Sequence, residues 1–289
     1  MLKHRSGGEV RLIAQPDHAA LSGALAAHWG NASFARPEAW GPCREPEQLR
    51  RQTLFGIAEH DNGWWEWEAD PRIDPRDGLP LHFLEAHGDD HFIRWQRGVA
   101  RFAEQRPWAA LLIGRHAYWL YAAQVDPHSD PAFRFPLLTA AVPPKEADSA
   151  EGRAIVRFLE GLRAAEERCL EKLREEPFGR EALEPAILRS SVRLLQIVDA
   201  LSLLLCARTP EPRRMLGAPR AGWDDRVDLE LRPLGDDRYA LDPYPFDQDP
   251  LCVACWETAV RDEETPIDYA ERRYGLPRRA RPIELTAQR

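Results

Sequence analysis

Hydrophobic residues recur at helical spacing through most of the first 207 positions, in stretches that end at proline, glycine or asparagine. Apolar residues three or four positions apart share one face of a helix, so each stretch predicts an amphipathic helix. The expected helices span residues 16–30, 45–61, 88–105, 108–123, 149–175 and 181–207. The last of these is apolar on nearly all sides, which predicts a helix buried in the core.

After Pro210 the pattern changes from helical to alternating, which is typical of strands. The strands expected there span 226–234, 238–242 and 252–260. Near the N-terminus, residues 9–14 predict a short strand or an extended entry into the first helix. The tail, residues 275–289, is basic, and we expect it to be partly disordered.

Together these patterns predict a mainly α fold. We expect a helical bundle over residues 1–210 and a small antiparallel β appendage, with the tail, over residues 211–289. The appendage is expected to pack on the bundle, so that the chain forms one compact unit. A chain of 289 residues is long enough to bury a sizeable core.

Composition and charge narrow the classes of function. The net charge of −8 argues against a general nucleic-acid-binding surface, so we expect a small molecule as the partner. The sequence contains no run of about 18 apolar residues, so it predicts no membrane span. The charged N-terminus lacks an apolar signal core, which predicts a cytoplasmic protein. The five cysteines, few and odd in number, fit a reducing compartment.

An adjacent His60-Asp61 pair ends the second expected helix, just before Asn62-Gly63. Both side chains can bind one metal ion where the helix end turns them the same way. An aspartate at a helix C-terminus is disfavoured by the helix dipole, and a nearby cation would offset that. The alternative is a structural helix cap, because Asp-Asn-Gly is also common turn chemistry.

Three further polar residues lie on apolar faces of other expected helices. Asp199 is surrounded by aliphatic residues, and a carboxylate buried there needs a metal, a cation or several donors. Its alternative partners are Arg193 and Ser202. His18 and His116 share faces with leucines at helical spacing. The alternatives are an exposed first-turn residue for His18 and a core histidine bonded to a carbonyl for His116.

Mixed histidine and carboxylate ligands favour a divalent transition metal (Mn, Fe, Zn, Ni or Co) over calcium. The expected site would hold one or two such ions. One of His82, His87 and His91 could complete a second metal position, although each alone is more typical of a surface residue.

The loop after the second helix supplies candidates for a substrate pocket. Trp64 and Trp65 could wall a pocket and stack on a ring, and His82 closes the same loop. The alternative is a loop packed on the helices. Arginines near the candidate helices could bind anionic oxygens, or could be solvated or paired. They are Arg94, Arg97, Arg115, Arg189 and Arg193.

Several segments together resemble a bacterial family of unknown function, the domain-of-unknown-function 3891 family. They are QPDHAALSGALAAHWGN, GIAEHDNGWW, LLIGRH, LLQIVDALSLLLC and DPYPF. They cover most of the chain. No activity is established for that family, so this resemblance adds no function.

The order His, His-Asp, His, Asp on successive helices resembles the HD-domain superfamily of metal-dependent phosphohydrolases. That resemblance implies an HD-like bundle and a primary metal bound by four ligands, which would be His18, His60, Asp61 and Asp199. His116 would belong to a second metal or to substrate binding. The sequence departs from the pattern in three ways: the spacing from His18 to His60 is long, Trp64 stands where signalling enzymes often have lysine, and no double histidine follows.

The leading hypothesis is therefore a metal-dependent hydrolase of HD type that acts on a phosphorylated small molecule, with metal-bound hydroxide as the nucleophile. His116 and Arg115 are its candidate catalytic residues. One alternative is a di-iron oxygenase of HD type. The other is a ligand-binding or regulatory protein without catalytic activity.

Overall fold

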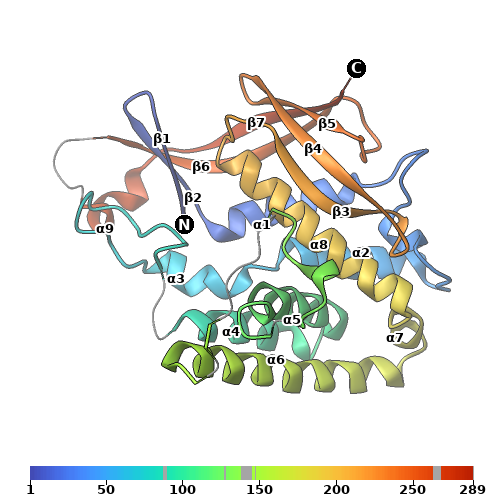
Figure 1. The fold of residues 1–289 in the computed structure, drawn as a ribbon. Helices are drawn as coiled ribbons and strands as arrows, with labels where there is room; N and C mark the ends of the chain where they lie inside the picture. The colour runs from blue at the N-terminus through green and yellow to red at the C-terminus, as the bar shows by residue number, and fades with distance from the viewer. Residues whose placement is uncertain (87–89, 127, 138–144, 147, 263–267, 289) are drawn as a thin grey trace.

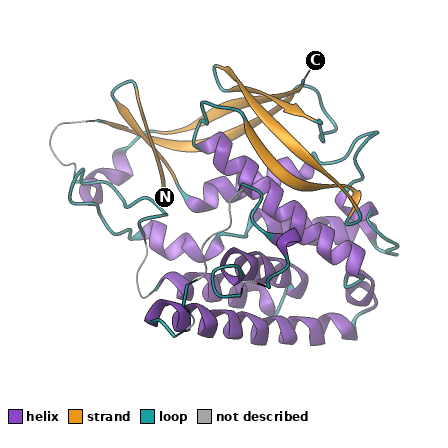
Figure 2. Cartoon of the chain, in the orientation of Figure 1, coloured by secondary structure: helices purple, strands orange, loops and turns teal. Residues whose placement is uncertain are grey.

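The chain folds into a curled sheet that lies on layers of helices (Figures 1 and 2). The computed structural model describes residues 1–86, 90–126, 128–137, 145–146, 148–262 and 268–288. It is 48% helix and 23% strand, and the strands form one seven-stranded sheet. The prediction of a mainly α bundle with a small β appendage is therefore wrong.

Each expected helix is present, with its ends shifted by a few residues. The main helices are α1 (Gln15–Ala27), α2 (Pro46–Ala58), α4 (His91–Ala103), α5 (Pro107–Ala122), α6 (Ala150–Glu175) and α8 (Pro185–Cys206). Proline begins α2, α5 and α8 because its missing N–H is not needed in the first helical turn. Short helices not expected from the sequence are α3 (Trp65–Ala69), α7 (Pro177–Ala182) and α9 (Tyr269–Arg272).

The sheet joins strands from both ends of the chain. Its strands are β1 (Leu2–Ser6), β2 (Glu9–Ile13), β3 (Arg213–Gly222), β4 (Asp225–Gly235), β5 (Arg238–Asp242), β6 (Leu251–Arg261) and β7 (Arg278–Ala287). They lie in the order β1-β2-β6-β7-β5-β4-β3. The pairing of β5 with β7 is parallel, and the other pairings are antiparallel.

Two parts of this sheet correct the sequence-based expectation. The N-terminal hairpin turns at Gly7-Gly8, where both residues have positive φ angles, 61° and 75°. The tail expected to be partly disordered forms β7, between β6 and β5. Ile283 and Leu285 bury the apolar side of β7, and Arg281 forms an ion pair with Glu257. The basic residues of the tail therefore do not prevent it from forming an ordered strand.

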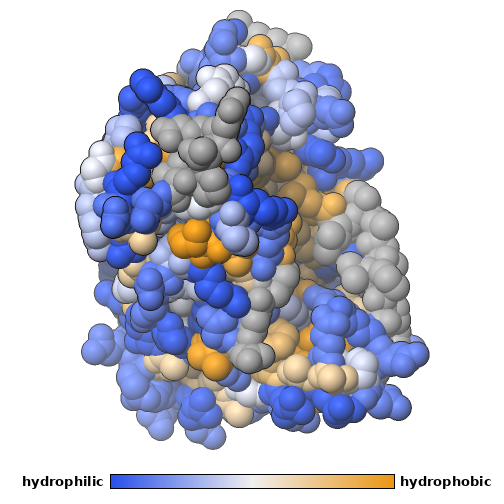
Figure 3. All heavy atoms as spheres, turned by 90° about the vertical axis from the view of Figure 1, so that its left-hand side faces the viewer, coloured by the Kyte–Doolittle hydropathy of each residue, from blue (hydrophilic) through white to orange (hydrophobic). Residues whose placement is uncertain are grey.

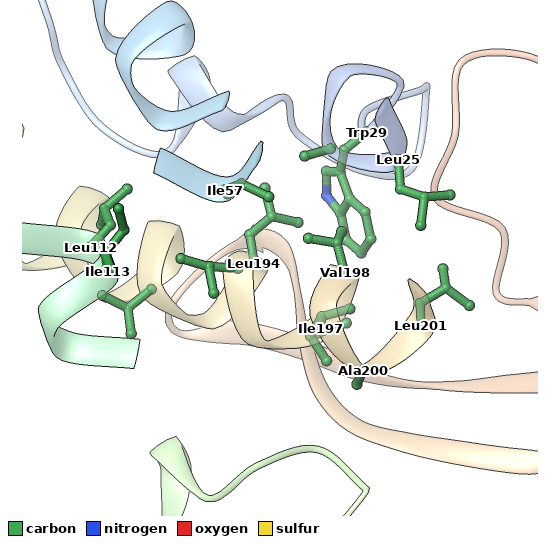
Figure 4. Close-up of a cluster of buried hydrophobic side chains, with 14 of the residues drawn as sticks. Leu25, Trp29, Ile57, Leu112, Ile113, Leu194, Ile197, Val198, Ala200 and Leu201 are labelled. Atoms are coloured by element: carbon green, nitrogen blue, oxygen red, sulfur yellow. The ribbon is translucent and has the colours of Figure 1, made fainter. Parts of the chain in front are cut away.

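The buried helix α8 joins the sheet to the other helices. It packs against α1 and β3, and also contacts α5 and α2. Figure 4 shows its Val198 and Leu201 beside Leu25 and Trp29 from the first helix and the turn after it. The expectation of a helix buried on most sides is confirmed. Within the described residues, no helix combines the length and hydropathy needed to cross a membrane.

Candidate metal centre

Four helices bring the predicted polar residues to one place. His18 lies in the first turns of α1, His60 and Asp61 lie in the turn after α2, His116 lies in α5, and Asp199 lies in α8. We call these five residues the His/Asp cluster. Each is at most 4% exposed, so all are removed from bulk water. Buried polar groups of this kind require partners, and the cluster supplies them.

Three members of the cluster could hold a metal ion. His18, His60 and Asp199 each offer one ligand atom, and these atoms all lie within 4.8 Å of one another. Imidazole nitrogen and carboxylate oxygen together suit a divalent transition metal. We call these residues the three-ligand set. They come from the start of one helix, the end of a second and the middle of a third, which fixes them on rigid elements.

The carboxylate of Asp199 faces two ways. Its Oδ1 lies 3.6 Å from Nε2 of His60 and 3.8 Å from Nδ1 of His18. Its Oδ2 lies 3.2 Å from Nε2 of His116. One oxygen therefore belongs to the three-ligand set, while the other orients His116.

The histidines of the three-ligand set are themselves oriented by neighbours. Nδ1 of His60 donates to the Ile57 carbonyl at 2.8 Å, which leaves Nε2 facing Asp199. Nδ1 of His18 lies 2.9 Å from the Ser202 hydroxyl. Such second contacts fix the ring orientation of metal-binding histidines.

Asp61 lies beside the three-ligand set and bonds to its neighbours. Its Oδ2 lies 2.8 Å from Nε2 of His18 and accepts a hydrogen bond from Nε2 of Gln15 at 3.2 Å. It is also 3.8 Å from Nε2 of His60. Because Nδ1 of His18 contacts Ser202, Nε2 is the nitrogen left for a metal, and Asp61 faces it. The role of Asp61 as a fourth ligand stays a prediction.

The cluster shifts the pKa values of its members in opposite directions. Burial would lower the pKa of the His60 imidazole, but the charges of Asp61 and Asp199 outweigh burial and raise that pKa to about 9. Burial would raise the pKa of Asp199, but His116 and His60 hold it well below its usual range. The pKa of His116 is lowered by its burial, against the effect of Asp199. At neutral pH, His60 is therefore cationic and His116 neutral.

A cavity of about 550 Å³ opens from the His/Asp cluster, and all five cluster residues line it. This volume is in the range of small-molecule sites. The surface on the side where α4 and α6 begin carries apolar patches among mostly hydrophilic residues (Figures 1 and 3). The cluster therefore forms the polar, buried end of a cavity large enough for a small molecule.

A family model described as a protein of unknown function (DUF3891) matches residues 1–262. The chain belongs to this family. No curated protein and no solved structure matches the chain. The span matched to DUF3891 contains the complete His/Asp cluster, so the resemblance to this family is confirmed over the part of the chain that builds the site. The resemblance to HD-type phosphohydrolases stays a prediction.

The other predicted site residues divide into those that line the cavity and those that do not. Trp64 lines it, whereas Trp65 is 44% exposed under the guanidinium of Arg101. His82 is not in the lining itself; its ring packs at a tilt on Phe83 and accepts a hydrogen bond from the Leu84 amide, and both of these neighbours line the cavity. His91 lines the cavity. His87 lies outside the described residues.

Arg115 is placed away from the cavity. Its Nε and Nη2 both donate to Glu166 of α6, at 3.0 and 2.6 Å. Arg97 pairs with Glu66, and Arg193 donates to backbone carbonyls and to Gln196. Among the described residues that line the cavity there is no arginine.

Gln15 is a cavity residue that the sequence reasoning missed. Its Nε2 donates to Asp61, and its buried Oε1 has no partner within the described part of the chain. Because it precedes His18 by three positions, it lies on the same helix face. That spacing is the signal that could have identified it.

Proposed function

We propose that this protein is a metal-dependent hydrolase that cleaves the phosphoester bond of a small molecule. The observation that carries the proposal is the three-ligand set at the buried end of the cavity. The order of its residues along the chain, His18, His60 and Asp199, agrees with the ligand order of HD-type phosphohydrolases. A divalent metal bound there would supply a Lewis acid and lower the pKa of a water molecule.

The residues present fit such an ion. Two imidazoles and one carboxylate make a donor set of the kind that transition metals prefer, and each is nearly completely buried. Ser202 holds the His18 ring through Nδ1, and Asp61, 2.8 Å from Nε2, offers a further carboxylate oxygen at the same place. Metal binding has to displace a proton from His60, because its pKa of about 9 keeps it protonated at neutral pH.

His116 is suited to accept the proton of the attacking water. A carboxylate only accepts hydrogen bonds, so the contact with Oδ2 of Asp199 places the ring hydrogen on Nε2. Nδ1 then carries the lone pair, and it is buried without a partner within the described residues. The pKa of His116 is lowered by burial, so the ring is neutral at pH 7 and available as a base.

Gln15 provides a second acceptor at the same end of the cavity. Oε1 of Gln15 and Nδ1 of His116 are both buried, and no partner for either occurs among the described residues. Both residues line the cavity. A water molecule that donates to either atom would be oriented for attack on a phosphoryl group held at the three-ligand set.

A second function, oxygen activation by two iron ions, is favoured by one observation. His91 and His116 line the cavity together with the three-ligand set, and a second ion would replace the contacts of His91 with Tyr121 or Arg94. Iron bound at two ions per chain would support this function, whereas hydrolysis with one non-redox metal would support the first.

The proposal is tested by turnover of 4-nitrophenyl phosphate after reconstitution with Mn, Ni, Zn or Fe. We expect hydrolysis that needs the metal and is lost in His60→Ala. His28→Ala is the matched control, because His28 is a partly exposed histidine paired with Asp247. Full activity of metal-free protein, or equal activity of His60→Ala, would overturn the proposal. Binding of the phosphate without turnover in any metal form would favour the regulatory alternative.

A further inference from the structure

Beyond the His/Asp cluster, the cavity is walled mainly by apolar side chains. These include Phe83, Phe92, Trp95, Leu120, Phe135 and Ile155. They come from the loop before α4 and from α4, α5, α6 and the segment between the last two. The cavity therefore has one polar end and a long hydrophobic wall.

Ring contacts hold this wall in place. Phe92 stacks on Phe158 of α6, with centroids 4.6 Å apart. Trp95 packs edge-on against His116, at 5.8 Å. The apolar space is thus bounded by side chains that are fixed by their neighbours, as in a preformed small-molecule site.

Outside the His/Asp cluster, the charged groups in the lining lie at the rim. Lys145 pairs with Glu151, and their side chains are 34% and 64% exposed. No described arginine lines the cavity, and the Gln124 amide already donates to the Leu120 carbonyl. A sugar or a polyphosphate would lose water along this wall without gaining matching hydrogen bonds or counter-charges.

We propose that the substrate is the phosphate monoester of an apolar alcohol, either alkyl or aryl. This inference rests on the proposed function for the bond that is cleaved, and on the cavity wall for the body of the substrate. Water oxygen bonds to phosphorus, the bond from phosphorus to the ester oxygen breaks, and a proton ends on the released alcohol. The single phosphoryl group lies at the His/Asp cluster, and the hydrocarbon lies between Phe92, Leu120 and Ile155.

The test uses ethyl, butyl, hexyl and octyl phosphate with the Mn-loaded protein, and ribose 5-phosphate as a polar comparison. We expect kcat/KM to rise about fourfold for each added CH₂ until the wall is covered, because each buried CH₂ contributes about 0.8 kcal/mol. Ribose 5-phosphate should be turned over no faster than ethyl phosphate. A series that is flat with chain length, or ribose 5-phosphate turned over as fast as hexyl phosphate, would overturn the inference.

In Leu120→Trp the larger side chain should fill the apolar end of the cavity. The value of kcat/KM should then stop rising at butyl phosphate, so that octyl phosphate is turned over no faster. Leu170→Trp is the matched control, because Leu170 is a partly buried helix leucine that does not belong to the cavity lining. Should Leu120→Trp fail to fold, the wild-type series alone still decides the question.

Binding of alkylphosphonates, whose carbon–phosphorus bond is not hydrolysed, separates this inference from the proposed function. Affinity that rises with chain length, without turnover of any phosphate ester, would support the apolar ligand class and contradict the hydrolase. Turnover without dependence on chain length would support the hydrolase and contradict the apolar substrate. Calorimetry on the metal-loaded protein measures this affinity.

Discussion

Oδ2 of Asp199 lies 3.2 Å from Nε2 of His116, while its other oxygen faces the histidines of the three-ligand set. One buried carboxylate thus joins a metal-binding position to a basic nitrogen. Removing either partner would leave the other without its main interaction in a site that excludes water. The relationship gives His116 a role different from that of His60, and the two roles can be separated by mutation.

Replacement of His116 by glutamine should lower kcat by about 10²–10⁴-fold, the usual contribution of a general base, while the bound metal remains. His116 is outside the three-ligand set, so its loss removes the proton acceptor and leaves the ligands. Steady-state kinetics and metal analysis on the same preparation measure both quantities. Loss of the metal together with the activity would identify His116 as a ligand and contradict the assigned role.

Metal affinity should rise with pH. The pKa of His60 is about 9 without metal, and the ion binds only the neutral ring. Each pH unit below about 9 should therefore reduce the apparent affinity about tenfold, with a plateau at higher pH. Titrations with Mn at several pH values test this. An affinity that is constant between pH 6.5 and 9 would show that no proton leaves His60.

The same pKa shift should make the metal-free protein less stable as the pH rises, whereas metal affinity rises with pH. The folded-state pKa of His60 lies above its ordinary value of 6.5, so its protonation stabilises the fold fully below pH 6.5. That contribution, about 3 kcal/mol at most, is lost as the pH rises toward 9. Urea unfolding of chelator-treated protein should show this loss of stability. In the His60→Gln variant the free energy of unfolding should change less with pH. A midpoint that rises over this range would contradict the pKa shift.

Arg115→Ala should leave kcat within about twofold and change the free energy of unfolding by less than about 1 kcal/mol. The guanidinium pairs with Glu166 near the surface and does not line the cavity. Activity and urea unfolding of this variant measure the two effects. A tenfold loss of kcat would place Arg115 in the site after all.

Truncation before Arg278 should prevent folding. β7 lies between β6 and β5, so its loss leaves both neighbours with unpaired edges and exposes the apolar positions under Ile283 and Leu285. Circular dichroism and solubility test this, with truncation after Ala287 as the control. A soluble, cooperatively unfolding protein without β7 would mean that the sheet is not essential to the fold.

The helices could be predicted from the sequence because helical periodicity is a local property. The sheet could not be predicted, because its pairings join distant segments: Val10 is paired with Val260, and Tyr239 with Leu285. In the strand 278–287, Arg279 and Arg281 fall on the same side as Ile283 and Leu285, so the apolar alternation is short and was concealed. Register between such strands depends on the whole fold.

The His/Asp cluster could be predicted because polar residues on apolar helix faces need partners. Two of the predicted residues, Arg115 and Trp65, lie outside the cavity lining for a physical reason. Adjacent helix residues point about 100° apart, so His116 faces the cavity while Arg115 faces α6. Trp64 and Trp65 differ in the same way. Sequence adjacency therefore indicates a segment, whereas the helix geometry decides which side chain reaches the site.

The most direct test of the metal centre is the metal content of protein purified without a His tag or chelator, measured by mass spectrometry. Wild type and His28→Ala should retain stoichiometric transition metal, and His60→Ala and Asp199→Ala should retain none. Absence of metal from the wild type even after reconstitution, or equal metal in all four proteins, would contradict the assignment of His18, His60 and Asp199 as ligands.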